Sequence, residues 1–357
     1  MKAYLILILY QITGIKYDKK YTEGSMIKFS IIIPVYNTEP FLKKCLESCI
    51  EQTHNNIEII CVDDCSTDNS REIIREFQEK DNRIKSIFYR KNESQYMARR
   101  TGALGATGDY ILFLDSDDTL VPNACALLAK KVEKAAVDMI QFGYTEIPGN
   151  KKVFSPFYRT AKERIAAYLA KENRYSPAVW TKAYKRDLVL KAYSKMDEFY
   201  GPRAQDVYTS IAITCFANSF SFLKKPLVNY SVGTGVSTRK GQPLASCIIW
   251  LSAYRTIIEK TTAFIAENLP EFTDKCKDME FFFVKDFMFS RLPQLSPDVS
   301  LEEKYRMLSS LPTYFSHEAL YSFFAESMHR YRYYEHFALT GSFLKRIKRI
   351  IKVILFH

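Results

Sequence analysis

Asp109-Tyr-Ile-Leu-Phe-Leu-Asp-Ser-Asp-Asp118 is the stretch that decides the fold, because an apolar run ends there at three carboxylates. Ile111 to Leu114 has the length and composition of a strand buried on both faces, as in a parallel sheet. Asp115, Asp117 and Asp118 then follow the carboxyl end of that strand, where open α/β sheets bind their ligands. Neighbouring carboxylates repel one another unless a cation shares them, so the pattern predicts a Mg²⁺ or Mn²⁺ site that holds a diphosphate. The alternative is a solvated acidic turn in which Asp118 caps the next helix.

A second acidic cluster follows another apolar run, Ile57 to Val62. Because the carboxyl ends of parallel strands meet at one edge of a sheet, Asp63 and Asp64 are expected to share a crevice with the first cluster. A nucleotide diphosphate with a divalent ion fits such a crevice, since carboxylates accept hydrogen bonds from base and ribose while the metal bridges the phosphates. The alternative is that Asp64 and Asp68 only shape a turn and cap a helix. We favour that local role for Asp68 and ligand binding for Asp63 and Asp64.

Apolar runs and helical patterns alternate along the first part of the chain. Segments with helical spacing, such as Ser70 to Lys80 and Gln95 to Ala106, lie between the runs. This alternation predicts an α/β fold with a mostly parallel sheet flanked by helices. Regular alternation ends near Pro148, and the mostly helical patterns of residues 245–340 predict a helical C-terminal region. The apolar runs are Phe29 to Val35, Ile57 to Val62, Ile84 to Phe88, Tyr110 to Leu114 and Asp138 to Tyr144.

The formal net charge of +11 over 357 residues raises the question of an anionic partner. A large share of the excess lies between Phe343 and His357, where apolar residues recur at helical spacing and five basic residues fill the other face. This amphipathic pattern predicts peripheral contact with a membrane surface through Phe343 to His357, and no nucleic-acid partner is predicted. The alternative is a terminal helix that docks on the protein's own core.

Eight scattered cysteines in a chain of this length favour reduced thiols in a cytoplasmic protein. Cys45 and Cys49 fit one face of a helix, so we expect core residues there and no metal cluster. At the other end of the chain, Ala3 to Ile12 is too short to span a bilayer and lacks a small-residue cleavage site. Met26 stands directly before the first convincing strand, so residues 1–25 are predicted to be an extension upstream of the natural start.

Three other classes of protein fit the sequence less well. A dinucleotide oxidoreductase needs its glycines between a strand and the following helix, whereas Gly102, Gly105 and Gly108 precede a strand. A nucleotidyltransferase is expected to carry a basic Gly-rich loop after its first strand, where this chain has Pro34-Val-Tyr-Asn-Thr-Glu. A non-catalytic adaptor at a membrane surface would explain the charge but not the two acidic clusters.

Three motifs resemble those of glycosyltransferase family 2 in order and spacing. They cover about the first 120 residues from Met26, and the resemblance thins beyond them to Val179 through Tyr184 and the segment around Asp206. The resemblance implies a GT-A-type, Rossmann-like fold and an inverting transferase that uses a nucleotide diphosphate sugar and Mn²⁺ or Mg²⁺. The motifs are Phe29-Ser-Ile-Ile-Ile-Pro-Val-Tyr-Asn37, Glu58-Ile-Ile-Cys-Val-Asp-Asp-Cys-Ser-Thr-Asp-Asn-Ser70, and Ala98-Arg99 through Gly108 to Asp118.

The resemblance also implies roles for single residues on the donor side. Asp64 resembles the carboxylate that contacts the base, Asp115 the ribose or metal-side position, and Asp117 the metal ligand. Arg99 resembles the arginine near the diphosphate. The nucleotide-sugar contacts expected on this basis are Pro34, Val35, Tyr36, Asp63, Asp64, Arg99, Asp115 and Ser116, with Asp115 and Asp117 at the metal.

On the acceptor side, the resemblance implies that Asp206 is the catalytic base. The family's base normally follows a glutamate, and here Gln205 replaces that acid, which removes a negative charge beside Asp206. Trp180 is a candidate for stacking on an acceptor sugar, with packing in the core as the alternative. Arg239 and Lys240 lie in a polar loop that either closes over the donor or stays a solvated surface loop.

These observations predict a GT-A catalytic domain at residues 26–240, with a nucleotide-binding half at 26–120 and an acceptor half at 121–240. A helical region at 241–340 and a basic amphipathic helix at 341–357 would follow it. The expected activity is metal-dependent, inverting transfer from a UDP-sugar to a hydroxyl of a saccharide or lipid-linked acceptor. The Lys, Ile, Asn and Tyr content is typical of an AT-rich bacterial genome, so surface polysaccharide synthesis at the inner face of the cytoplasmic membrane is the predicted setting.

Overall fold

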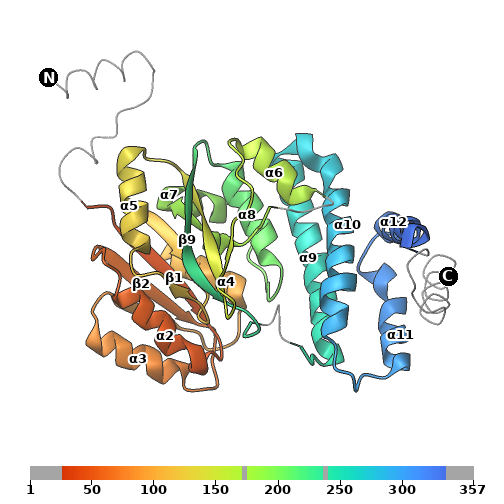
Figure 1. Ribbon diagram of the computed structural model, residues 1–357, viewed down its shortest axis with the longest axis horizontal. Coiled ribbons are helices and arrows are strands. Elements are labelled where there is room, and N and C mark those ends of the chain that lie inside the picture. Colours follow the sequence, from red (N-terminus) through yellow and green to blue (C-terminus); the bar gives the residue numbers. More distant parts are fainter. Residues whose placement is uncertain (1–25, 171–174, 236–239, 335–357) are drawn as a thin grey trace, which may run out of the picture.

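The computed structural model describes residues 26–170, 175–235 and 240–334 (Figure 1). The predicted extension at 1–25, Arg239 and the basic segment Phe343 to His357 lie outside the described residues. In the described ranges, no helix is both long and apolar enough to cross a bilayer.

The first four strands form the parallel half of the sheet that the sequence predicts. They lie in the order β3-β2-β1-β4, so β2 and β4 flank the central β1. Val35 at the end of β1 is paired with Asp63 at the end of β2, which brings the carboxyl ends of these strands to one edge. The strands are β1 (Phe29–Val35), β2 (Ile57–Asp63), β3 (Ile84–Phe88) and β4 (Tyr110–Phe113).

Beyond β4 the sheet becomes mixed, so the parallel arrangement holds for only part of it. β8 pairs antiparallel with β4 and with β6, whereas β6 and β9 run parallel. The predicted strand Asp138 to Tyr144 is confirmed as β6. The remaining strands are β5 (Thr119–Leu120), β6 (Met139–Ile147), β7 (Lys151–Val153), β8 (Lys182–Lys185) and β9 (Phe220–Ser231).

Helices cover both faces of the sheet, because alternate residues of its strands point to opposite sides. Ile31 and Ile33 pack in one core cluster with α2, α3 and α5, and Ile32 packs in the other with α4, α6, α7 and α8. Gly102 lets α4 approach β1 closely, since a Cβ atom there would lie 2.5 Å from Cγ2 of Ile32. The helices are α2 (Glu39–Ile50), α3 (Ser70–Lys80), α4 (Gln95–Leu104), α5 (Ala124–Lys134), α6 (Ala161–Leu169), α7 (Arg186–Tyr193) and α8 (Gln205–Cys215).

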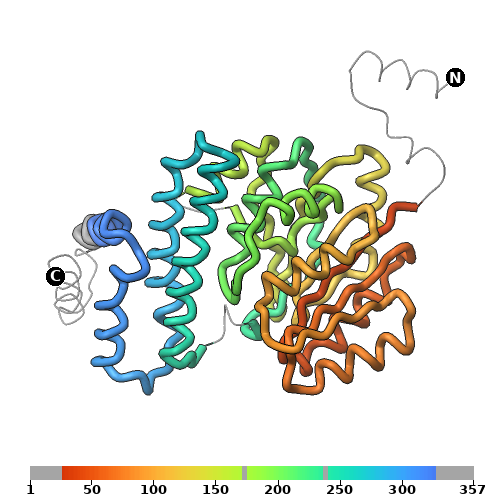
Figure 2. The backbone as a smooth tube through the Cα atoms, turned by 180° about the vertical axis from the view of Figure 1, so that it is seen from behind, coloured from red at the N-terminus to blue at the C-terminus, as the bar shows by residue number. Residues whose placement is uncertain are grey.

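The helical C-terminal region packs beside this α/β body (Figure 2). Its longest helix, α9, contacts α8, and Phe264 of α9 packs edge-on against Tyr208. Arg203 and Arg291 both lie over the Trp250 ring, which ties the segment before α8 to this region. The predicted helical character is confirmed by α9 (Leu244–Asn268), α10 (Cys276–Asp286), the π-helical turn η4 (Phe287–Arg291), α11 (Leu301–Ser309) and α12 (His317–Tyr334), with short 3-10 turns at η3 (Pro270–Lys275), η5 (Leu292–Gln294) and η6 (Leu311–Thr313).

Candidate active site

The loop after β1 presents one side chain to solvent at the carboxyl edge. Pro34 and Val35 are buried within the strand, and the Val35 carbonyl accepts a hydrogen bond from the Asp64 N–H at 2.8 Å. Tyr36 is 48% exposed, and Asn37 next to it adopts a left-handed φ of 50°. Of the three predicted contacts in this loop, Tyr36 is therefore the side chain that a ligand can reach.

The three carboxylates of the second acidic cluster have different hydrogen-bond partners. Asp68 accepts from the backbone N–H of Glu39 and of Ser70, so it serves the starts of two helices, as predicted for that residue. Asp63 is fully buried and accepts from Arg71 Nε at 2.5 Å and from the Ser66 N–H. This environment fits a structural role for Asp63 in shaping the loop after β2.

Asp64 follows the end of β2 and is held by the neighbouring loop. Its two oxygens accept from the N–H groups of Glu93 at 2.6 Å and Ser94 at 2.9 Å. Burial raises the pKa of Asp64, and these two hydrogen bonds oppose the rise. The Ser94 hydroxyl accepts from the N–H of Gly201, which anchors the exposed Tyr200 in the same neighbourhood. Burial, Asp64 and Tyr36 together raise the Tyr200 pKa, so two exposed tyrosine rings lie near Asp64.

Arg99 joins the two halves of the site. Its guanidinium is 3% exposed and donates to Oδ1 of Asp115 and to Oδ1 of Asp206, both at 2.5 Å. Burial opposes the charge of Arg99, but the two carboxylates hold its pKa above the usual value. The structure thus brings together the predicted arginine, the predicted metal-side carboxylate and the predicted base. Tyr193 interacts electrostatically with Arg99 and Asp206, and burial raises the pKa of its hydroxyl.

Asp206, the predicted base, lies at the start of α8. It is the second residue of α8, and the helix is preceded by Ala204 in the left-handed conformation at φ 57°. Burial raises the pKa of Asp206, the Arg99 charge lowers it, and the nearby Asp115 raises it, so that the net direction is upward. A raised pKa gives the carboxylate a greater proton affinity, which favours general base catalysis. Oδ1 is bound by Arg99, whereas no described residue donates to Oδ2.

Asp117 and Asp118 lie in different environments although they are adjacent. Oδ2 of Asp117 accepts from the Thr234 hydroxyl at 2.8 Å, and burial followed by the charge of Asp115 raises its pKa. Asp118 is fully buried, and burial together with Asp115 and Asp117 raises its pKa to about 9, so it is neutral at pH 7. Asp118 accepts from the Ser231 N–H at the end of β9 and does not cap the following helix. Ser116, between Asp115 and Asp117, is buried.

The donor set fits a divalent metal that the substrate helps to bind. Asp115 is 20% exposed at its side chain, and the two hydrogen bonds that its carboxylate accepts from described residues both go to Oδ1. In the part of the chain that the structure describes, no group of three His, Cys, Asp or Glu side chains could hold an ion by itself. Mg²⁺ and Mn²⁺ sites of transferases often have one or two carboxylates, with substrate phosphates and water completing the coordination. Asp115 and Asp117 meet that requirement. Burial is the main cause of the raised pKa of Asp117, and the charge of Asp115 adds to it.

The contacts of two glutamines in this site were not predicted from the sequence. Gln95 donates through Nε2 to Oδ1 of Asp115 at 3.1 Å, and Gln205 donates through Nε2 to Oε1 of Gln95 at 2.6 Å. Gln95 lies one helical turn before Arg99 on α4, so the i, i+4 spacing was the available signal for a shared face. For Gln205, the signal was its departure from the family's usual acid.

The predicted acceptor contacts are not brought into this cluster. Trp180 is buried, stacks on Tyr230 with ring centroids 5.2 Å apart, and meets Tyr144 edge-on, which supports the packing alternative. Lys240 is exposed. Lys182, two residues after Trp180, is buried and donates to the Ala178 carbonyl, and burial followed by the Arg164 charge lowers its pKa to about 7.

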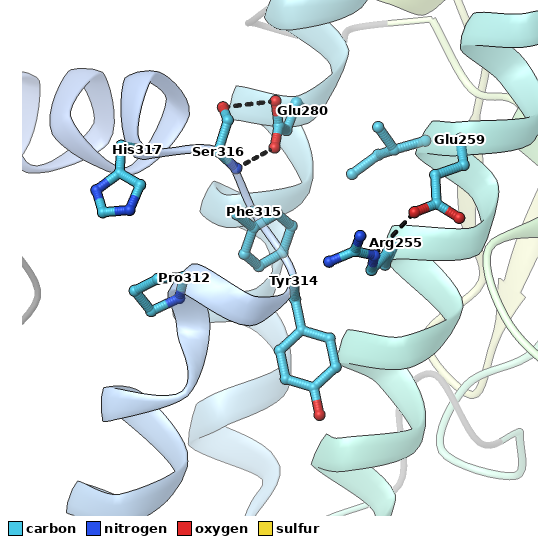
Figure 3. A pocket seen from close by; sticks show the side chains of 9 residues that line it. Arg255, Glu259, Glu280, Pro312, Tyr314, Phe315, Ser316 and His317 are labelled. Carbon is cyan, nitrogen blue, oxygen red and sulfur yellow. Dashed lines mark hydrogen bonds and ion pairs between the residues drawn. The ribbon is translucent and has the colours of Figure 1, made fainter.

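A hollow of about 330 Å³ lies elsewhere, in the helical C-terminal region (Figure 3). Its polar groups are engaged with one another: Glu280 accepts from the N–H and hydroxyl of Ser316, and Arg255 pairs with Glu259. None of its lining residues comes from the strands or helices that hold the carboxylates. The carboxylate cluster is therefore the candidate active site, and this hollow is separate from it.

Comparison with known proteins identifies a family. A sequence model described as glycosyl transferase family 2 matches residues 30–209, about half of the chain and all of the carboxylate cluster. The glycosyltransferase GlyA of Streptococcus pneumoniae is 31% identical over 227 residues, which cover 59% of this chain and 32% of that protein. The chain thus spans about a third of that relative's length. The putative glycosyltransferase EpsH of Bacillus subtilis is 29% identical over 247 residues, covering 67% of this chain and 69% of EpsH.

Solved structures show the same fold. A crystal structure of residues 1–349 of S. aureus TarS in complex with UDP-GlcNAc aligns with a TM-score of 0.59 at 24% identity, covering 81% of this chain and 80% of that one. The complex of the same TarS fragment with UDP aligns with a TM-score of 0.58 at 23% identity, with coverages of 80% and 79%. These likenesses confirm the GT-A-like architecture, including a helical region after the mixed sheet.

Proposed function

The chain belongs to glycosyl transferase family 2, and on that premise we propose that it is a metal-dependent, inverting enzyme that takes its sugar from a UDP-sugar. The observation that carries this proposal is the placement of Arg99 between Asp115 and Asp206. It sets the candidate base next to the carboxylate of the donor edge, so an acceptor hydroxyl and a bound sugar would meet between them.

The proposed reaction needs one base. Asp206 takes the proton of the acceptor hydroxyl at Oδ2 while the acceptor oxygen forms a bond to the anomeric carbon. The bond from that carbon to the diphosphate oxygen breaks on the opposite face, which inverts the configuration. A divalent ion held by Asp115 and Asp117 would supply positive charge for the departing diphosphate. Burial raises the pKa of Asp206, and the Arg99 charge opposes that rise, so Arg99 favours the ionised form of the base.

The donor side of the crevice offers chemistry that suits a nucleotide. Tyr36 and Tyr200 present exposed aromatic rings near Asp64, and a base can stack on such rings while the carboxylate accepts from a base N–H. The S. aureus TarS fragment was solved with UDP-GlcNAc, which makes that compound the first donor to test. A contact between Asp63 and the ligand stays a prediction. The oxygens of Asp63 already accept hydrogen bonds within the protein, from Arg71 and from the Ser66 N–H.

We place the acceptor among saccharides or lipid-linked saccharides of bacterial surface polysaccharide synthesis. Curated relatives from bacteria support this setting at the level of the family. The sequence of Phe343 to His357 supports peripheral contact with the inner face of the cytoplasmic membrane. Flotation with anionic liposomes should separate full-length protein from a truncation that ends at Thr340. Equal partitioning of the two proteins would contradict the membrane contact.

The experiment that tests the activity is a screen for nucleotide release. UDP-, GDP-, dTDP- and CMP-sugars are each incubated with the protein and Mn²⁺, and the active donor is then tested with saccharide and lipid-linked acceptors. Asp206→Asn should lose turnover. Asp187→Asn is the matched control, because Asp187 also lies in the first turn of a helix but its side chain is 70% exposed and pairs with Arg186. No release from any donor, or equal loss in both variants, would contradict the proposal.

A further inference from the structure

A ring of hydrogen bonds joins α8 to the donor-side strand end, and two glutamines complete it. Gln205, the first residue of α8, is 4% exposed and donates to Gln95, the first residue of α4. Gln95 donates onward to Oδ1 of Asp115. Arg99 bridges that same oxygen to Asp206, and the peptide bond between Gln205 and Asp206 closes the ring. The candidate base is therefore connected to Asp115 by two routes.

The direction of the hydrogen bonds in this ring follows from Asp115. An ionised carboxylate only accepts, so Gln95 has to turn its NH₂ group toward Asp115 and its oxygen toward position 205. That oxygen needs a donor, and the NH₂ group of Gln205 supplies one. An ionised acid at position 205 cannot donate. It would either set two oxygens against each other or make Gln95 turn over, which would point an amide oxygen at Asp115.

The pair also fixes the relation between two helices. Gln95 begins α4, which holds Arg99 one turn later, and Gln205 begins α8, which holds Asp206 as its next residue. A bond of 2.6 Å between the buried Gln205 amide and the partly buried Gln95 amide thus ties the starts of both helices together. Loss of this tie would let α8 shift relative to α4, and the Asp206 carboxylate would shift with it.

We infer that Gln205 is a positioning residue, matched to Gln95, that sets the placement of Asp206 against Asp115; this inference rests on the proposed function. Gln205 acts through Gln95 and Asp115 and does not need to touch donor or acceptor. The glutamine that replaces the family's usual acid is, in this chain, the donor that the Gln95 orientation requires. The acid's negative charge is absent, and Arg99 is shared by only two carboxylates, Asp115 and Asp206.

A double-mutant cycle tests the ring. Gln205→Glu keeps the size of the side chain but replaces the NH₂ group that donates to Gln95 with an oxygen that can only accept. Gln95→Lys in the same protein should repair it, because an ammonium at position 95 donates both to the new carboxylate and to Asp115. Gln205→Met is the size control that removes the hydrogen bond without adding charge. Each variant, Gln95→Lys alone and the wild type are compared in the denaturation midpoint, and in kcat and KM for UDP-GlcNAc hydrolysis or for the donor that the screen identifies.

The ring predicts a fall in kcat of about 10- to 100-fold for Gln205→Glu, the usual size of an effect through an outer hydrogen bond, with donor KM changed by less than about twofold. The double variant should recover most of the lost kcat and midpoint, so that the two changes are far from additive. Wild-type kcat in Gln205→Glu, or additive effects in either measurement, would overturn the inference. If Gln205→Glu fails to fold, the test passes to Gln205→Met, and a wild-type kcat in that variant would overturn the inference. The denaturation cycle uses no substrate, so a wild type without turnover contradicts the proposed function, whereas additive midpoints contradict the ring.

Discussion

The donor edge and the acceptor-side helix α8 hold their carboxylates in different ways. At the donor edge, Asp64 is bound by backbone N–H groups of an adjacent loop, and Asp63 by Arg71 and the Ser66 backbone. On α8, Asp206 depends on one long-range partner, Arg99, for its only hydrogen bond from a described residue. Asp63 and Asp64 are thus held by α3 and by adjacent loops within the first third of the chain, whereas the base is placed by a contact between α4 and α8, which lie far apart in the sequence. Substitutions should therefore affect binding on one side and chemistry on the other.

The largest effect is expected at the donor edge, from Asp117→Ala. This variant removes a proposed metal ligand, so binding of UDP with Mn²⁺ should be lost and turnover should fall to background. Asp117 is only partly buried, so the variant should unfold at nearly the wild-type temperature. Calorimetry of UDP with and without Mn²⁺ measures the binding, with Asp187→Ala as the exposed control. Wild-type affinity in Asp117→Ala would mean that the metal is held elsewhere.

Asp206→Asn should lose catalysis and keep donor binding, whereas Asp117→Ala should lose donor binding. The donor should bind as in the wild type, while transfer should fall by about 10²- to 10⁴-fold, the typical contribution of a general base. Arg99 can still donate to the new amide oxygen, so the placement of α8 should persist. Single-turnover measurements with saturating donor separate this loss from binding. If donor affinity fell as much as the rate, the proposed division between the two sides would be wrong.

Arg99→Gln should change the pH dependence of the rate, because Arg99 contacts carboxylates on both sides of the site. The rate requires ionised Asp206, so it rises as the pH rises through the Asp206 pKa, which burial raises and Arg99 lowers. Without the Arg99 charge the pKa rises further, and the acidic limb of the rate profile should move to higher pH by at least about one pH unit. Arg100→Gln is the matched control, because Arg100 is on the same helix but pairs with Glu198 and the Tyr193 carbonyl. An acidic limb that moves equally in both variants, or in neither, would contradict this role for Arg99.

The difference between the donor edge and α8 also explains which parts of the site could be predicted from the sequence. Asp115 and Asp117 follow a strand directly, so the rule that ligands bind at the carboxyl ends of parallel strands was enough to place them at the edge. The pairing of Arg99 with Asp206 depends on how α4 and α8 pack, and no local pattern encodes it. The direction of the Gln205 and Gln95 amides depends on that packing as well.

The antiparallel half of the sheet was missed for a related reason. β8 is only four residues long and follows the irregular segment that holds Trp180, so its sequence carries neither a clear period of two nor a long apolar run. Its pairing with β4 and β6 is decided by tertiary contacts. Length and apolar content sufficed for β1 and β2, which are buried along their whole length.

Trp180→Phe is expected to have the smallest effect on activity, and it sharpens the boundary of the acceptor side. Trp180 is buried against Tyr230 and Tyr144, so the smaller ring should leave a gap and lower stability by about 2 kcal/mol. Kinetic constants should change by less than about twofold, because the indole is engaged with these two rings and has little surface left for a sugar. Thermal unfolding measures the first effect, and initial rates against the identified acceptor measure the second. A clear rise in acceptor KM at unchanged stability would mean that Trp180 turns toward the acceptor, and that this region belongs to the active site.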